Sequence, residues 1–184
     1  LAHCIEAFSS PFYHPMAEGT AVEGLRLVKE NIQEVYHNGS NVEARAHMLV
    51  ASMMGAAAFQ KGLGAIHSIT HPVNSLYHTH HGTTNGTVMP FVLNFNRSVI
   101  EKKFDRLAKF LNISNGFEGV VNWIIELKKE MEIPETLKEM GVKKGDEVKL
   151  APLAQEDPST GGNPLEMSED KFQELILNCI EGNY

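Results

Sequence analysis

Apolar residues recur along most of this chain at spacings of three and four, the period at which side chains share one face of an α-helix. The clearest case predicts an amphipathic helix over residues 16–36, ended by turn residues at 38–40. Similar stripes predict helices over 100–111, 117–131 and 168–180. No stretch shows the strict alternation of a half-buried strand. The pattern therefore predicts an all-α helical bundle.

Three stretches add detail to that prediction. Residues 42–61 are apolar on every side, which is typical of a central, buried helix. Between Gly141 and Met167 the periodicity is lost and prolines and glycines accumulate, which predicts a largely irregular connection. A second apolar stretch covers residues 83–97, where Pro90 is expected to bend the chain or interrupt its helix.

Length, charge and cysteine content exclude several classes of protein. A chain of 184 residues with 42% hydrophobic content can bury a substantial core as one domain, or two at most. A formal charge of −7 argues against a nucleic-acid partner, and no apolar run reaches the roughly 20 residues that cross a membrane. Cys4 and Cys179 have no CxxC partner, so each is expected to be a small buried side chain. With no signal peptide visible, we expect a cytoplasmic protein.

Histidines provide the chemical signal, because neutral imidazole is the commonest metal ligand. Five of the nine lie within fifteen residues, at positions 67, 71, 78, 80 and 81. His67 and His71 are four residues apart and would share one face of a helix, although Pro72 restricts that segment to a helix start or a kinked turn. Gly82 would permit a tight turn directly after His81.

A sixth histidine, His3, lies at the start of the chain, inside a predicted helix that has no capping residue and no initiator methionine. We interpret the chain as a piece of a longer protein. A transition metal needs ligands that converge from several elements, and His3, His67 and His81 could provide three of them. Imidazole suits zinc, iron, copper and nickel, so the ligand type leaves the metal open.

The other histidines have simpler interpretations. A lone histidine is more often a surface or hydrogen-bonded residue than a ligand, and this applies to His14, His37 and His47. His80 and His81 cannot both point inward in a regular element. We therefore favour His81 as the ligand and expect His78 and His80 at most to line the cleft.

The segment at 62–82, with Asn85 beyond it, resembles the signature of the iron-containing (group III) alcohol dehydrogenases. Residues 3–7 are similar to the second half of that family's Asp-x-x-x-His helix motif, and residues 157–164 resemble its closing loop. The likeness runs almost end to end. The spacing of fourteen residues from His67 to His81 is its most specific element.

This resemblance implies that residues 1–184 form one helical metal-binding domain, the C-terminal domain of the fold shared with the dehydroquinate synthases. A Rossmann-like N-terminal cofactor domain would be absent from the chain. In the family one aspartate and three histidines hold the metal. The matching positions are His3, His67 and His81, and the aspartate would lie upstream. His71 matches a histidine near the nicotinamide that relays protons, which implies a catalytic and cofactor-binding role.

The implied parent enzyme oxidises an alcohol reversibly to an aldehyde or ketone, with NAD(P) as hydride acceptor and Fe²⁺ or Zn²⁺ activating the substrate oxygen. Its expected partners are small alcohols and aldehydes and a second copy in a homodimer, with no nucleic acid and no membrane. The present chain alone is expected to be inactive. Two alternatives stay open: a metal-dependent lyase or cyclase of the same superfold, and a non-catalytic helical metal-binding module.

Overall fold

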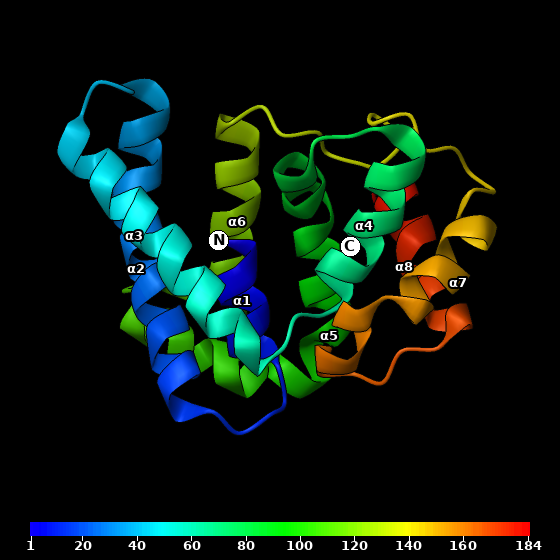
Figure 1. Ribbon diagram of the computed structural model, residues 1–184, viewed down its shortest axis with the longest axis horizontal. Coiled ribbons are helices and arrows are strands. Elements are labelled where there is room, and N and C mark those ends of the chain that lie inside the picture. Colours follow the sequence, from blue (N-terminus) through cyan, green and yellow to red (C-terminus); the bar gives the residue numbers. More distant parts are fainter.

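The computed structural model describes residues 1–184 and contains helices only (Figure 1). The α-helices are α1 (Ala2–Ser9), α2 (Pro15–His37), α3 (Val42–Ala58), α4 (Ala65–Tyr77), α5 (His81–Phe110), α6 (Gly116–Glu130), α7 (Glu147–Glu156) and α8 (Glu169–Glu181). Two 3₁₀ helices complete them, η1 (Phe59–Lys61) and η2 (Pro158–Gly162). The prediction of an all-α protein is confirmed.

One hydrophobic core of 36 buried residues joins most of these helices. The longest helix, α5, contacts α1, α4, α6 and α8. It continues through Pro90 without a break, so of the two expected effects of this proline, a bend or an interruption, the interruption does not occur. The missing N–H costs one helical hydrogen bond, but Met89, Phe91 and Val92 are buried on either side and hold the segment in place. Both cysteines are free and buried, as expected.

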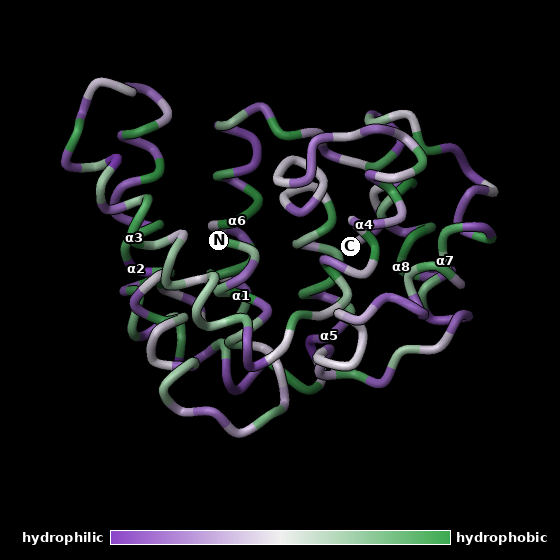
Figure 2. Tube along the Cα trace, in the orientation of Figure 1, coloured by the Kyte–Doolittle hydropathy of each residue, from purple (hydrophilic) through white to green (hydrophobic).

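Helix α3 lies at the edge of the molecule beside α2 (Figure 1). It is not the central buried helix that its composition predicts, because 72% of Leu49 and 66% of Met53 are exposed. One face alone is buried, through the small residues Ala51 and Gly55 among others. Figure 2 accordingly shows hydrophobic positions at this edge as well as in the core. Small side chains let α3 approach its neighbours closely, but they leave its larger apolar side chains outside the contact.

No single helix combines the length and hydropathy of a membrane span. The pair Val42–Lys61 and Ala65–Tyr77 reaches them only jointly, and the two segments are bent by 108° relative to each other.

The region from Gly141 to Met167 is more regular than predicted, because it contains α7 and η2. Helix α7 packs against α8 and α4 and buries Leu150, Ala151 and Ala154, which share one helical face. The three apolar positions are too few to stand out beside Pro152, which lies inside the helix. Packing against α8 and α4 therefore stabilises a helix that the local sequence pattern does not predict.

Candidate metal centre

Four histidines from three helices lie side by side, His3 on α1, His67 and His71 on α4, and His81 on α5. The ring centroids of His3 and His67 are 5.0 Å apart, those of His67 and His81 5.3 Å, and those of His71 and His81 5.6 Å. The structure thus brings together every histidine that the sequence singled out as a metal ligand or catalytic residue.

The connection between α4 and α5 produces this arrangement. Helix α4 runs through Pro72 to Tyr77, and its C-cap residue His78 is left-handed with φ of 54°. The prediction that Pro72 restricts this segment to a helix start or a kinked turn is therefore wrong. The tight turn lies at His78 and not at Gly82, which is already inside α5. Nδ2 of Asn74 donates to Thr79 and Thr84, and these bonds tie the end of α4 to the start of α5.

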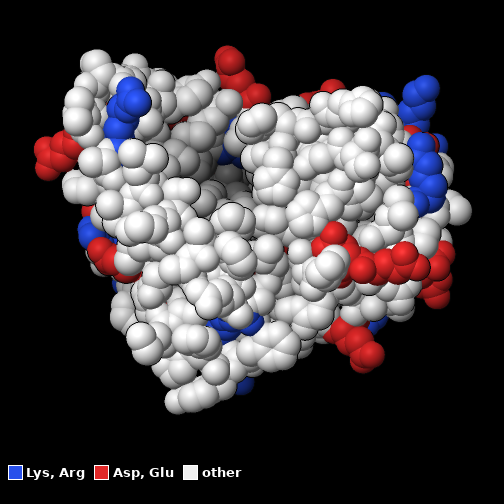
Figure 3. Space-filling view, in the orientation of Figure 1, with Lys and Arg blue, Asp and Glu red and all other residues white.

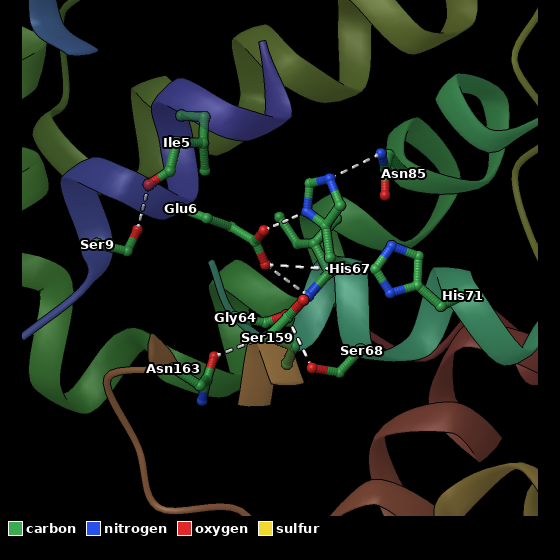
Figure 4. A network of polar contacts seen from close by, with 12 residues as sticks. Ile5, Glu6, Ser9, Gly64, His67, Ser68, His71, Asn85, Ser159 and Asn163 are labelled. Carbon is green, nitrogen blue, oxygen red and sulfur yellow. Dashed lines mark hydrogen bonds and ion pairs between the residues drawn. The ribbon is translucent and has the colours of Figure 1, made fainter. Parts of the chain in front are cut away.

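Glu6 fixes both the start of α4 and the orientation of His67 (Figure 4). This buried carboxylate of α1 accepts a hydrogen bond from the backbone N–H of Ile66 at 2.8 Å. Its other oxygen lies 2.5 Å from Nδ1 of His67. Gly64 offers no side-chain cap, so Glu6 supplies the negative charge that the helix N-terminus favours. Because Nδ1 of His67 donates to Glu6, Nε2 keeps its lone pair.

His81 is oriented in the same way by a neutral partner. Its Nδ1 lies 3.1 Å from Oδ1 of Asn74, so Nδ1 donates and Nε2 keeps the lone pair. Nε2 of His81 is 3.0 Å from Nδ2 of Asn85, and Nε2 of His67 is 3.4 Å from the same atom. The lone pairs of the two imidazoles therefore face one buried amide group.

His71 has a carboxylate partner on the opposite side of the cluster. Its Nδ1 lies 2.7 Å from Oδ2 of Asp157, the N-cap residue of η2. Burial acts to raise the pKa of Asp157, but hydrogen bonds from the Ser159 N–H and from His71 outweigh it and lower the pKa below its ordinary value. Asp157 is thus held as a carboxylate that orients His71 and leaves Nε2 of this half-exposed imidazole free.

The environment keeps two of the proposed ligands neutral, the state that metal binding requires. Burial lowers the pKa of His3 to about 4, and the neighbouring His67 contributes to this shift. Burial and the adjacent imidazoles also lower the pKa of His81. At neutral pH both rings therefore have lone pairs available for a cation.

As the side chains lie, no three His, Cys, Asp or Glu residues form a complete metal-binding arrangement. The ring of His3 stacks on His67 with an angle of 15° between their planes and also contacts Phe59. The amide of Asn85 occupies the point that the other two imidazoles face. The donor set fits a divalent metal in chemistry and burial, provided that His3 and Asn85 turn their side-chain ends.

Sequence reasoning assigned no role to Glu6, Asn74, Asn85 or Asp157, which hold the histidines in place. One signal was available, because Glu6 lies three residues after His3 and shares its helical face. Four of the remaining histidines have ordinary partners. His14 and His80 cap α2 and α5, His37 pairs with Glu130, and His47 contacts Asn31.

A cavity of about 290 Å³ opens beside His3 and His81. Most of its walls are apolar and come from α2, α5, α6 and the segment after α6, including Ile32, Met89, Ile124, Leu127, Met131 and Ile133. Figure 3 shows the face of the molecule hollowed between the α2–α3 pair and the helices around α5, with few charged side chains on the visible walls. The candidate centre therefore lies next to an apolar hollow.

Residues 1–180 match the C-terminal part of the Fe-containing alcohol dehydrogenase family. The chain is 34% identical over 96% of its length to the 4-hydroxybutyrate dehydrogenase of Cupriavidus necator. It is 32% identical over 98% of its length to the NAD-dependent methanol dehydrogenase of Bacillus methanolicus. These alignments cover 48% and 49% of the two relatives, so the chain spans about half their length.

Solved structures agree with this match. A 1,3-propanediol oxidoreductase superimposes with a TM-score of 0.92 and 28% identity, over 97% of this chain and 49% of the other. The iron-containing alcohol dehydrogenase of Thermococcus thioreducens shares the fold with a TM-score of 0.89 and 24% identity, over 100% of this chain and 49% of the other. This chain belongs to the Fe-containing alcohol dehydrogenase family and corresponds to its C-terminal part.

Proposed function

We propose that this chain is the helical metal-binding half of an NAD(P)-dependent alcohol dehydrogenase that interconverts alcohols with aldehydes or ketones. The observation that carries the proposal is the pair of imidazoles, His67 and His81, whose Nε2 atoms face one buried point beside His3 and His71. Relatives named as NAD-dependent methanol dehydrogenase and NADPH-dependent butanol dehydrogenase support the choice of cofactor.

In this proposal His3, His67 and His81 would hold Fe²⁺ or Zn²⁺, since imidazole nitrogen suits both metals. When bound, the metal would polarise the substrate oxygen as a Lewis acid. Glu6 and Asn74 fix the ring orientation of His67 and His81 through Nδ1, which raises the basicity of Nε2. An aspartate outside this chain would complete the ligand set, as the family resemblance implies.

His71 would relay the hydroxyl proton. Its Nδ1 is held by Asp157, so Nε2 is the atom that accepts a proton, and the carboxylate stabilises the imidazolium that results. NAD(P), carried on a Rossmann-like N-terminal domain, would accept the hydride. Small alcohols and aldehydes are the proposed substrates. We also propose a homodimeric, cytoplasmic parent enzyme, which follows from the family resemblance.

The complete gene product, loaded with Fe²⁺ or Zn²⁺, tests this proposal through NAD(P)H formation from a series of small alcohols. We expect H67A and H81A to lose both metal and turnover. H71A should keep its metal and lose turnover at least a hundredfold, in line with the contribution of general acid–base catalysis. A metal-loaded protein that reduces neither NAD nor NADP with any alcohol would contradict the proposal.

A further inference from the structure

Three asparagines of this chain are followed directly by glycine, at Asn38, Asn85 and Asn115. An Asn–Gly pair can modify itself, because the backbone nitrogen of the glycine can attack the side-chain amide carbon of the asparagine before it. Glycine has no Cβ to obstruct this attack, and its backbone rotates freely. Whether the reaction occurs in a folded protein depends on how firmly the structure holds each pair.

The reaction is an intramolecular amide exchange followed by hydrolysis. A bond forms between the glycine nitrogen and Cγ of the asparagine. The bond from Cγ to Nδ2 breaks, and Nδ2 leaves as ammonia with the proton of the glycine amide. Water then opens the cyclic imide at either of its two carbonyls. The product is aspartate or isoaspartate, and water is the only co-reactant.

The pair at Asn85 is held by regular secondary structure. Asn85 and Gly86 lie inside α5, and Asn85 is buried. A helical N–H donates to the carbonyl four residues earlier, so the glycine nitrogen cannot approach Cγ unless the helix opens at this point. We therefore expect this pair to be protected.

The pair at Asn115 is held by its packing against α5. Gly116 begins α6, and a Cβ built there would overlap the carboxylate of Asp105. Oδ1 of Asp105 also accepts a hydrogen bond of 2.9 Å from the N–H of Phe117. The contact restricts rotation of this backbone, and a neighbouring negative charge opposes the loss of a proton from the glycine amide. We expect protection here as well.

The pair at Asn38 has far more freedom. Asn38 and Gly39 are exposed and lie in the turn between α2 and α3, at the outer end of these two helices (Figure 1). The N–H of Gly39 has no acceptor in the protein. A Cβ built on Gly39 would have only the carbonyl of Val35 as a neighbour, at 4.0 Å. This backbone can therefore rotate to bring the glycine nitrogen to Cγ.

We propose that Asn38 is a site of spontaneous deamidation in the folded protein and that Asn85 and Asn115 are protected from it. The hydroxyl of Ser40 lies 2.6 Å from Oδ1 of Asn38 and polarises the carbonyl that the glycine nitrogen attacks. Nδ2, the leaving group, is held only by an exposed bond of 2.9 Å to Glu34, where water competes. The same dipeptide thus differs in reactivity through its surroundings alone.

Deamidation also changes the turn that contains Asn38. Oε1 of Glu34 accepts hydrogen bonds of 2.9 Å from Nδ2 of Asn41 and from Nδ2 of Asn38, and these two bonds lower the pKa of Glu34. A carboxylate at position 38 removes one donor and faces Glu34 with a like charge. It also places a negative charge at the C-terminus of α2, which the helix dipole disfavours. The modification therefore weakens the connection between α2 and α3.

Peptide mapping by mass spectrometry tests the assignment on the folded chain during incubation at mildly alkaline pH. We expect Asn38 to convert at least tenfold faster than Asn85 or Asn115. In guanidinium chloride the three pairs should react at similar rates, because the fold no longer distinguishes them. G39A should slow the reaction at Asn38 at least tenfold. It is a matched control, because φ of Gly39 is not positive and alanine fits there.

Similar rates at all three pairs in the folded chain, or the slowest reaction at Asn38, overturn the assignment. A wild-type rate in G39A also overturns it. N38D reproduces the aspartate product and should lower the urea midpoint, whereas N38S removes the amide without adding a charge and should lower it less. Equal midpoints for N38D and N38S overturn the effect of the new charge on the turn.

Discussion

Two helical hairpins dominate the molecule, and they differ in the kind of side chain that each one buries or exposes. The α4–α5 hairpin buries His67, which is 2% exposed, against Glu6, which is 4% exposed. The α2–α3 hairpin leaves Leu49 and Met53 largely in solvent. Polar groups are buried where a second helix supplies a hydrogen-bond partner, and apolar groups are exposed where no further helix covers them. Burial here follows the neighbours of a residue more than its hydropathy.

Removal of Glu6 should have the largest effect on this contrast. Glu6→Ala leaves the N–H of Ile66 in the first turn of α4 and Nδ1 of His67 without an acceptor, and we expect a loss of about 3 kcal/mol in the free energy of unfolding. Urea denaturation followed by circular dichroism measures it. Glu6→Gln, which keeps one acceptor oxygen, should lose less than Glu6→Ala. A loss below about 1 kcal/mol in Glu6→Ala would show that the carboxylate does not anchor α4.

A methyl group at Gly24 should weaken the α2–α3 hairpin where it meets α1. Its Cβ would lie 2.8 Å from Sγ of Cys4, so we expect Gly24→Ala to lose about 1–2 kcal/mol, the net of overpacking and a gain in helix propensity. Gly19→Ala is the matched control on α2, because its Cβ would have no neighbour within 4 Å and should be neutral or stabilising. Equal thermal midpoints for the two variants would mean that the contact relaxes freely.

Lys61 joins the two hairpins and should make stability depend on pH. Its buried ammonium donates to the carbonyls of Ala7 and Ser10 at the end of α1. Burial, and then repulsion by Lys103, lower the pKa of Lys61 to about 8, below its value in the unfolded chain.

The charged form is thus disfavoured in the folded state, so the contribution of Lys61 to stability is least favourable below pH 8 and improves as pH rises through 8 towards 10.5. We expect wild type to gain stability relative to Lys61→Met between pH 7.5 and pH 10, as measured by urea midpoints. A constant difference between the two proteins across this range would contradict the lowered pKa.

A substitution on the exposed face of α3 should have the smallest effect on the free energy of unfolding. Leu49→Ala removes a side chain from a position that is 72% exposed, so we expect a change within about 0.5 kcal/mol. Leu25→Ala, at a fully buried position on α2, is the contrasting variant and should lose about 2–5 kcal/mol. Urea unfolding of both variants measures the difference. Similar losses in the two would show that this face of α3 is covered in solution.

Periodicity and histidine density predict much of this structure. The helix expected over 16–36 is present as α2 (Pro15–His37), because its stripe meets a core on one side only. Composition fails for α3, since small apolar residues fit both a buried helix and a peripheral one that approaches its neighbour closely. It also fails for α7, whose few apolar positions gain their support from α8 and α4.

The partners of the histidines could not be predicted for a related reason. Glu6 and His67 are 61 residues apart in sequence, and His71 and Asp157 are 86 apart. Neither pair leaves a local pattern, because each contact exists only once separate helices have packed. The histidines themselves stand out through the density of one residue type. Their orientation depends on carboxylates and amides that look ordinary in the sequence.

Helix α1 has only eight residues, yet it contacts both hairpins. Glu6 on one side holds α4, while Cys4 on another fits against Gly24 and Gly55 of the α2–α3 pair. This short helix therefore links the packing of the two hairpins. We therefore expect a tilt of the α2–α3 pair to shift His3 and Glu6 as well, because both belong to the helix whose Cys4 packs against that pair.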